Sequence, residues 1–285
     1  MKPTHERAAG RVVACDVAAR ARVRIPLEAA AELRRCPVPG SNLPATFLKH
    51  ADEQSIVGLA AVYRAIHDHG LNPEGFHHWS VLGGSCALGR PTLASALQKF
   101  FEEGAWGVSP HLIPHRSLHS LSGTISHALK IHGANYGVGG GPSSPAETLL
   151  AAAAMLGTER VPGVWVVLTT LDPDAAPDRA GNLPPGTHLL GIALALTLPA
   201  AEPIGPRLCL RAGEPTALTG PPLDLPRLAA LLDRLQGPSA GTLACEMDGG
   251  ARLELKWPAT TEAVRRDAAC GLRPPHLSVV VETER

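Results

Sequence analysis

The sequence predicts an α/β fold in which helices are layered on a mostly parallel β-sheet, and three segments carry this prediction. Residues 133–156 combine a short strand, a glycine-rich turn and an apolar helix. Residues 163–170 and 186–198 are nearly continuous apolar runs, as in strands buried on both faces of a helix-covered sheet. Because strand, helix and strand follow one another across residues 134–170, we expect a right-handed, parallel βαβ unit.

The glycine-rich turn, residues 139–144, is called the elbow below. Its glycines permit backbone angles that other residues avoid, so the chain can turn sharply. Ser144 suits the N-cap of the following helix, and Pro145 suits its first position. Glu147 lies three residues after the cap and completes a capping box. The elbow is therefore expected at a helix N-terminus, where amides favour an anion or a thiolate. Its glycines are Gly139, Gly140 and Gly141.

Few side chains near the elbow could act as a nucleophile. Ser144 is explained as a plain helix cap, which leaves Ser143 as a weak candidate. A serine nucleophile also needs a base, and the sequence does not identify one. Cys86, in a glycine turn after a predicted strand, is the only thiol in a suitable context, and a small buried hydrophobe is the alternative interpretation.

The remaining elements follow from apolar periodicity and from turn residues. Helices are predicted at residues 51–70, 91–103, the second half of 116–132, 225–235 and 260–269. Further strands are predicted at residues 11–17, 77–82, 241–247, 251–257 and 277–282, and loops at 37–44, 104–114 and 172–185.

A cluster of prolines suggests a division of the chain. Residues 1–200 are expected to form the main domain, residues 201–222 a Pro-rich linker, and residues 223–285 a small α+β segment. The last segment is too short to repeat the architecture of the first.

Composition argues against several classes of function. Basic and acidic residues balance at 26 each, which argues against a nucleic-acid or anionic-membrane footprint. The longest apolar run, residues 189–198, is too short to span a bilayer. The six cysteines form no Cys-x-x-Cys pair, and the N-terminus lacks a signal-peptide pattern. We therefore expect a soluble cytoplasmic protein without structural zinc.

One histidine pair has a spacing found in metal sites. His115 and His119 are four residues apart, a spacing that suits a metal on a helix. Pro114 and the absence of a nearby acidic third ligand weaken that interpretation. The sequence therefore predicts no metal site.

Five segments together resemble the N-terminal half of a β-ketoacyl synthase, a member of the thiolase-like superfamily. Residues 51–71 are similar to an early helix of that family, and residues 79–89 to the strand and glycine turn that follow. Residues 108–114 and 122–136 are similar to the segments that precede its active site. The elbow then falls on the nucleophile turn, which the family writes Thr-Ala-Cys-Ala-Ser-Ser. The resemblance implies a thiolase-like fold, first half only, with a short divergent C-terminal segment.

The nucleophile position departs from the family pattern. Counting forward from Asn135 places the family's cysteine on Pro142, and counting back from the serine pair places it on Gly141. After residue 150 the chain has only His188 and His276, and neither precedes glycine as the family's two catalytic histidines do. No catalytic residue can therefore be carried over to this chain.

The resemblance points first to a chain-length-factor-type subunit, which keeps the fold, lacks the cysteine and pairs with an active synthase. The family dimerises beside the strand before the elbow, so Asn135, Tyr136 and Val138 are the expected interface residues. The partner would be a second copy or a β-ketoacyl synthase, and an acyl carrier protein is a further possible partner. No bound cofactor is implied beyond an acyl-phosphopantetheine on such a carrier.

Two alternatives remain open at this point. A divergent acyltransferase or thioester hydrolase of the same fold would use Cys86, Ser143 or a nearby histidine, with the amides of Gly139, Gly140 and Gly141 around the thioester oxygen. An interaction module unrelated to acyl chemistry is also compatible with the missing second half, because fold alone does not establish function. The sequence favours a non-catalytic protein and does not name an acyl chain or a pathway.

Overall fold

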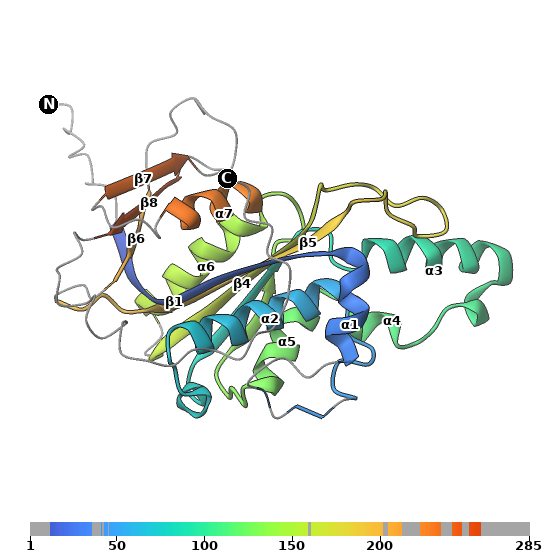
Figure 1. Cartoon of the computed structure of the whole chain (residues 1–285), viewed down its shortest axis with the longest axis horizontal. Helices are drawn as coiled ribbons and strands as arrows, with labels where there is room; N and C mark the ends of the chain where they lie inside the picture. The colour runs from blue at the N-terminus through green and yellow to red at the C-terminus, as the bar shows by residue number, and fades with distance from the viewer. Residues whose placement is uncertain are drawn as a thin grey trace, which may run out of the picture.

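The core of the structure, a computed structural model, is an eight-stranded sheet with strand order β3-β2-β4-β5-β1-β6-β8-β7 (Figure 1). The structure describes residues 12–35, 41, 43–44, 46–158, 161–201, 205–212, 223–234, 241–246 and 251–257. The strands are β1 Val12–Pro26, β2 Ser80–Ser85, β3 Asn135–Val138, β4 Gly163–Asp172, β5 His188–Thr197, β6 Arg207–Ala212, β7 Gly241–Glu246 and β8 Ala251–Trp257.

Helices cover both faces of this sheet. The α-helices are α1 Ala30–Arg35, α2 Glu53–Asp68, α3 Arg90–Glu103, α4 Leu112–Arg116, α5 His119–Ala128, α6 Ser144–Thr158 and α7 Leu225–Arg234. Short 3-10 helices are η1 Leu27–Ala29, η2 Pro73–Phe76 and η3 Ala105–Gly107. No helix among the described residues has both the length and the apolar character needed to cross a bilayer.

The α/β class is confirmed, but the sheet is not mostly parallel. Among the described strands, β2 pairs in parallel with β3 and β4, and the other five pairings are antiparallel. The connection from β4 to β5 contains no helix, and a parallel return normally needs a helical crossover. The parallel part is the predicted βαβ unit, in which β3 and β4 flank β2 and are joined through α6.

The two faces of β4 separate two layers of the core. Val166 and Leu168 pack with α6 and α7 on one face, whereas Trp165 and Val167 pack with α2 and α5 on the other. Both β4 and β5 are buried along nearly their whole length, as their apolar composition predicted. The predicted helices at residues 51–70 and 225–235 are confirmed as α2 and α7.

Several predicted boundaries were wrong because tertiary neighbours decided them. β1 was expected to end at residue 17, yet it continues to Pro26 because it pairs with β5 on one side, while the buried Ala19 packs with α2 residues. The strand expected at residues 77–82 begins only at Ser80, after η2.

The C-terminal part extends the same sheet. β6 lies inside the predicted Pro-rich linker at residues 201–222, so that segment is not linker throughout. The predicted hairpin is confirmed as β7 and β8, and β6 joins it to β1. The division into a main domain and a C-terminal segment stays a prediction. The helix and strand predicted at residues 260–269 and 277–282 lie outside the described residues.

Candidate functional site

The candidate site lies at the carboxyl ends of the three parallel strands, where open α/β sheets usually bind ligands. β2 ends at Ser85 and β3 at Val138, and each is followed by a glycine-containing turn. The amide of Ala87 donates a hydrogen bond to the carbonyl of Gly140 at 3.0 Å, which ties the two turns together. The structure therefore brings the predicted candidates of both turns, Cys86 and the elbow, to one end of the sheet.

The elbow has the sharp backbone turn that its glycines predicted. Gly139 and Gly140 have φ angles of 80° and 127°, which L-residues rarely adopt. No atom lies within 4 Å of where a Cβ on Gly141 would be, so this position is open.

Ser144 closes the elbow instead of capping the helix as predicted. It is fully buried as the first residue of α6. Its Oγ accepts a hydrogen bond from the Gly140 amide at 2.8 Å and donates one to the Gly141 carbonyl at 2.6 Å. The predicted capping box fails because α6 begins one residue earlier than expected, and the amide of Glu147 bonds to the Ser143 carbonyl. The Ser144 hydroxyl therefore both accepts and donates a hydrogen bond within the elbow backbone.

Ser143 and Cys86 differ in how they could react. The Ser143 hydroxyl donates to Oε1 of Glu147 at 2.8 Å, and none of its described hydrogen bonds involves a histidine. Cys86 is 7% exposed, and its Sγ lies 3.9 Å from Oδ2 of Asp174. Burial, with the negative charge of Asp174 added, raises the pKa of the Cys86 thiol, while Thr170 and Arg90 oppose the rise. A nucleophilic cysteine instead needs a lowered pKa, so that more of it is thiolate at neutral pH.

We therefore expect Cys86 to react more slowly with iodoacetamide in the folded protein at pH 7.5 than in guanidinium, because its raised pKa leaves less thiolate and its side chain is buried. Peptide mass spectrometry over a labelling time course measures the two rates. Asp174→Asn should speed labelling of the folded protein, because it removes a negative charge beside the sulfur. Rapid stoichiometric labelling of folded wild-type protein would instead identify a reactive thiol.

A buried network of polar side chains joins the start of α2 to this end of the sheet. Gln54, in the first turn of α2, donates from Nε2 to the Cys86 carbonyl at 3.1 Å and accepts from Thr169 at 3.0 Å. Thr169 of β4 and Ser85, the last residue of β2, share a hydrogen bond of 2.8 Å. Asp52, the N-cap of α2, accepts from the amide of Gln54 at 2.8 Å. The network fixes the helix, both strands and the turn relative to one another.

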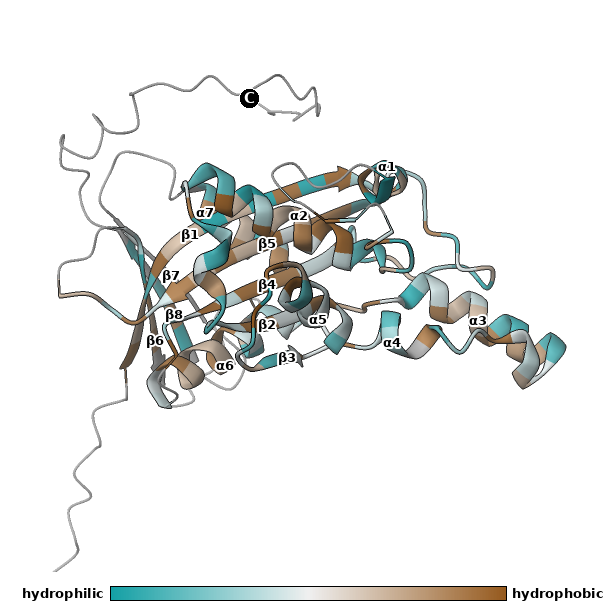
Figure 2. Ribbon diagram, turned by 90° about the horizontal axis from the view of Figure 1, so that it is seen from below, coloured by the Kyte–Doolittle hydropathy of each residue, from teal (hydrophilic) through white to brown (hydrophobic). Residues whose placement is uncertain are grey.

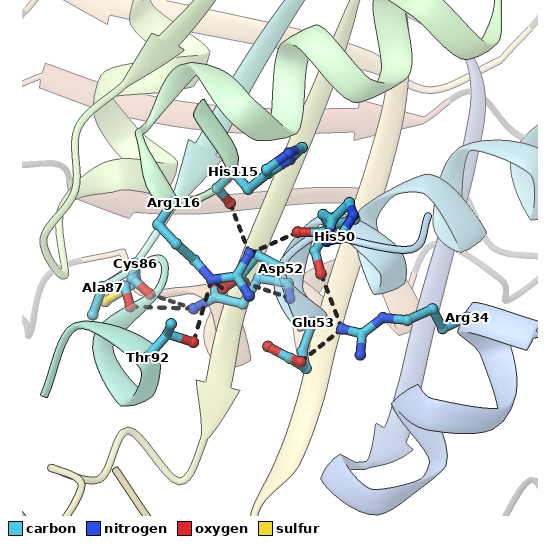
Figure 3. Close-up of polar contacts among 11 residues, drawn as sticks. Arg34, His50, Asp52, Glu53, Cys86, Ala87, Thr92, His115 and Arg116 are labelled. Atoms are coloured by element: carbon cyan, nitrogen blue, oxygen red, sulfur yellow. Dashed lines mark hydrogen bonds and ion pairs between the residues drawn. The ribbon is translucent and has the colours of Figure 1, made fainter. Parts of the chain in front are cut away.

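Two arginines hold the start of α2 (Figure 3). Arg116 lies 3.3 Å from the carboxylate of Asp52 and donates to the carbonyls of His50 and His115. Arg34 donates to Glu53 at 2.7 Å. Burial raises the pKa of Asp52 to about 6, with Glu53 adding to the rise and Arg116 opposing it.

Sequence reasoning missed this network. Asp52 stands directly before an apolar helical run, a recognisable N-cap signal. Its partner Arg116 belongs to α4, far along the chain, and no local pattern connects the two.

His115 and His119 are not on one helix, because α4 ends at Arg116 and α5 begins at His119. The rings of His111 and His115 instead lie 5.8 and 5.7 Å from that of His50. The described residues place no three His, Cys, Asp or Glu side chains in a metal-binding arrangement.

The predicted interface residues lie on β3, an edge strand of the described sheet. Tyr136 is 53% exposed, whereas Asn135 and Val138 are half-buried. The Oδ1 of Asn135 accepts from Ser122 of α5 at 3.4 Å.

Comparisons with known proteins agree with this architecture. Residues 41–161 match the family model described as "Beta-ketoacyl synthase, N-terminal domain". A search of curated protein sequences found no match.

Solved structures similar to this chain have low sequence identity. A chain of "The ishigamide ketosynthase/chain length factor" aligns with a TM-score of 0.54 and 14% identity, over 87% of this chain and all of that one. A chain of a ketosynthase in complex with its chain length factor from Xenorhabdus doucetiae aligns with a TM-score of 0.49 and 13% identity, over 88% and 100%. A chain of a type II PKS acyl-carrier protein complex with its ketosynthase aligns with a TM-score of 0.46 and 14% identity over 67% of this chain, which spans 63% of that chain's length.

Proposed function

We propose that the protein is a non-catalytic partner subunit of an active β-ketoacyl synthase. Residues 41–161 match the N-terminal domain of that family and are divergent from it. In this role it would resemble a chain length factor. It would share a dimer interface with the synthase and shape the space around an acyl chain that the synthase extends. That chain would arrive as an acyl-phosphopantetheine thioester on a carrier protein.

The observation that carries this proposal is an intact elbow without a nucleophile. Gly141 and Pro142 occupy the two positions on which the family's cysteine falls, and neither side chain can attack a thioester. The Ser144 hydroxyl is held by Gly140 and Gly141, and Cys86 is a buried thiol with a raised pKa. The elbow thus makes its sharp turn at Gly139 and Gly140 with no side chain in place that could react with a thioester.

The edge strand β3 supports a dimer. It is four residues long, and within the described sheet it pairs only with β2. An exposed edge with an apolar side chain invites pairing with another chain, and Tyr136 is such a side chain. A ketosynthase and chain length factor are named together in the description of one solved structure of similar fold, and that pairing is the arrangement we propose here.

Co-expression tests this function. The chain is co-expressed with the β-ketoacyl synthase encoded beside it, and the complex is measured by size exclusion with mass determination. We expect a stable heterodimer that is lost in the double variant Tyr136→Asp/Val138→Asp, because two buried carboxylates without partners would oppose strand pairing. Leu198→Asp is the matched control, since Leu198 is 52% exposed beyond β5 and should leave the heterodimer intact.

Two outcomes would contradict the proposal. If the protein runs alone, or forms a heterodimer that the β3 charges do not affect, the partner-subunit function or its interface is wrong. If the protein forms only a homodimer that the same charges disrupt, β3 is an interface but the synthase is not the partner.

One hydrogen bond favours the catalytic alternative and gives it a direct test. Ser143 donates to the Glu147 carboxylate, which is the nearest arrangement to a nucleophile and base in the elbow. Incubation with an acyl-pantetheine thioester should leave the intact mass unchanged if the protein is non-catalytic. A covalent acyl adduct that disappears in Ser143→Ala would instead establish a divergent acyltransferase or hydrolase.

A further inference from the structure

We propose that α3 and η3, residues 90–107, form an apolar arm that clasps the same partner subunit that pairs with β3. This inference rests on the proposed function, because it assigns a second contact surface to that partner. Figures 1 and 2 show α3 projecting from the body of the molecule. The helix predicted at residues 91–103 from apolar periodicity is confirmed as α3, and the structure leaves its apolar side in solvent.

The arm exposes several large apolar side chains. Among the described residues, no residue of α3 is buried. Phe100 is 49% exposed, Phe101 80% and Trp106 99%, and Leu97 beside them is 58% exposed. Aromatic side chains each bury about 150–250 Å² when fully covered, so the exposed parts of these three together offer roughly 340–570 Å². The rings of Phe100 and Phe101 are in contact, with centroids 6.1 Å apart, and exposed apolar surface of this extent is often an interaction site.

The base of the arm is anchored to the candidate site, so its direction is defined. Arg90 forms an ion pair with Asp174 at 2.6 Å, and Arg116 donates to Thr92 at 3.2 Å. A Cβ on Gly181 would lie 2.4 Å from the Pro91 carbonyl oxygen, which shows that the loop between β4 and β5 packs closely on the first turn of α3. The tip, which carries the aromatic residues, is therefore held away from the body by fixed contacts at its base.

The size of β3 argues that its partner needs a second surface. A four-residue strand spans roughly 14 Å, and strand pairing covers a strip of about 5 Å beside it. A stable specific interface buries about 800 Å² on each partner. The edge of β3 falls well short of this area, and the exposed aromatics of the arm supply a large part of the difference.

The arm and β3 are connected through α4 and α5, because Arg116 of α4 contacts Thr92 at the base of the arm and α5 packs on both α4 and β3. Figure 2 shows β3, α4 and α3 in a row along the lower edge. Leu118, at the junction of α4 and α5, is 37% exposed and covers Gly137 and Gly140 of the β3 segment. One partner lying along this side can contact the edge strand, Leu118 and the arm together.

The charges of the arm favour a protein partner over a membrane. Arg90 is paired with Asp174, which leaves Lys99 against Glu102 and Glu103. An interfacial membrane helix is rich in Lys and Arg on its polar face, and this helix is not. The helix has one apolar side and one polar side that is nearly neutral. This composition is expected of a helix that docks on a protein.

The test compares two surface variants in the purified heterodimer. Phe101→Ser/Trp106→Ser removes the two most exposed aromatics, and Leu198→Ser is the control away from the arm. Dissociation constants are measured by titration calorimetry, and circular dichroism confirms that each free variant keeps its fold. We expect the arm variant to bind the synthase at least about 30-fold more weakly than wild type, because buried aromatics are common hot spots, and the control to bind as wild type does.

Hydrogen exchange provides a second measurement without mutation, and we expect slower exchange of the amides of residues 97–106 in the heterodimer. Unchanged affinity of the arm variant and unchanged exchange in a stable heterodimer would overturn the arm while leaving the proposed function intact. Failure of the wild-type chain to form any heterodimer would overturn both. Loss of self-association in the arm variant, with the heterodimer unaffected, would assign the arm to a second copy and overturn the partner named here.

Discussion

Replacing Arg116 by methionine is expected to destabilise the protein by about 3–5 kcal/mol at pH 8, which is the cost of leaving a buried carboxylate without its cation. The side chain of Asp52 is 3% exposed and that of Arg116 is 14% exposed. Arg116 also joins the start of α2 to α4 through the carbonyls of His50 and His115. Urea unfolding at fixed pH measures the change in the free energy of unfolding.

The cost of Arg116→Met should fall as the pH is lowered. The folded-state pKa of Asp52, about 6, lies above its ordinary value of 3.8. The stability that Asp52 contributes is therefore fully present below the ordinary value and is lost as the pH rises through about 6. At pH 5 the folded carboxyl is mostly protonated and loses little when its cation is removed. Burial, His50 and Arg116 lower the pKa of His115, so removing Arg116 also eases protonation of that ring at acid pH.

Two controls separate the buried charge from a general effect of removing an arginine. Arg22 forms an ion pair with Asp233 at 2.6 Å, but both side chains are about two-fifths exposed, at 42% and 41%. Arg22→Met should cost less than about 1 kcal/mol, because solvent screens exposed pairs. The double variant Asp52→Asn/Arg116→Met should recover part of the stability and show no dependence on pH near 6. Equal costs for both arginines at pH 8 would show that the carboxylate is not buried.

The second large effect is expected at Gly137, where Gly137→Ala should cost about 2–3 kcal/mol. A Cβ at this position would lie 2.3 Å from both the carbonyl carbon and the carbonyl oxygen of Leu118, and 2.7 Å from the amide nitrogen of His119. These are backbone atoms at the start of α5 and cannot rotate away as a side chain can. The helix would have to move from β3, which also carries the proposed edge of the interface.

Gly141→Ala is the matched control within the same segment. No atom lies within 4 Å of a Cβ at Gly141, so alanine should be neutral or should stabilise by up to about 1 kcal/mol by restricting the unfolded chain. Urea unfolding of both variants measures the difference. If Gly137→Ala is as stable as Gly141→Ala, then α5 does not pack against β3 as closely as the structure has it.

Local sequence signals were sufficient for much of the fold and for the position of the elbow. The apolar periodicity of residues 51–70 predicted α2, and the β-branched run at residues 163–170 predicted β4. The glycines at residues 139–141 predicted a sharp turn, and Gly139 and Gly140 do have positive φ angles. The resemblance to a β-ketoacyl synthase N-terminal half also came from local motifs in the right order, and the family match at residues 41–161 confirms it.

Features that depend on contacts between distant residues were decided only by the tertiary structure. The direction of β5, the length of β1 and the membership of β6 in the sheet follow from which strands lie side by side. The apolar side of α3 has the same periodicity as that of a buried helix, yet no described element covers it. Asp52 and Arg116 meet only because the chain folds α4 back over the start of α2. Periodicity and turn residues act over a few neighbouring positions, whereas burial, strand partners and ion pairs depend on the path of the whole chain.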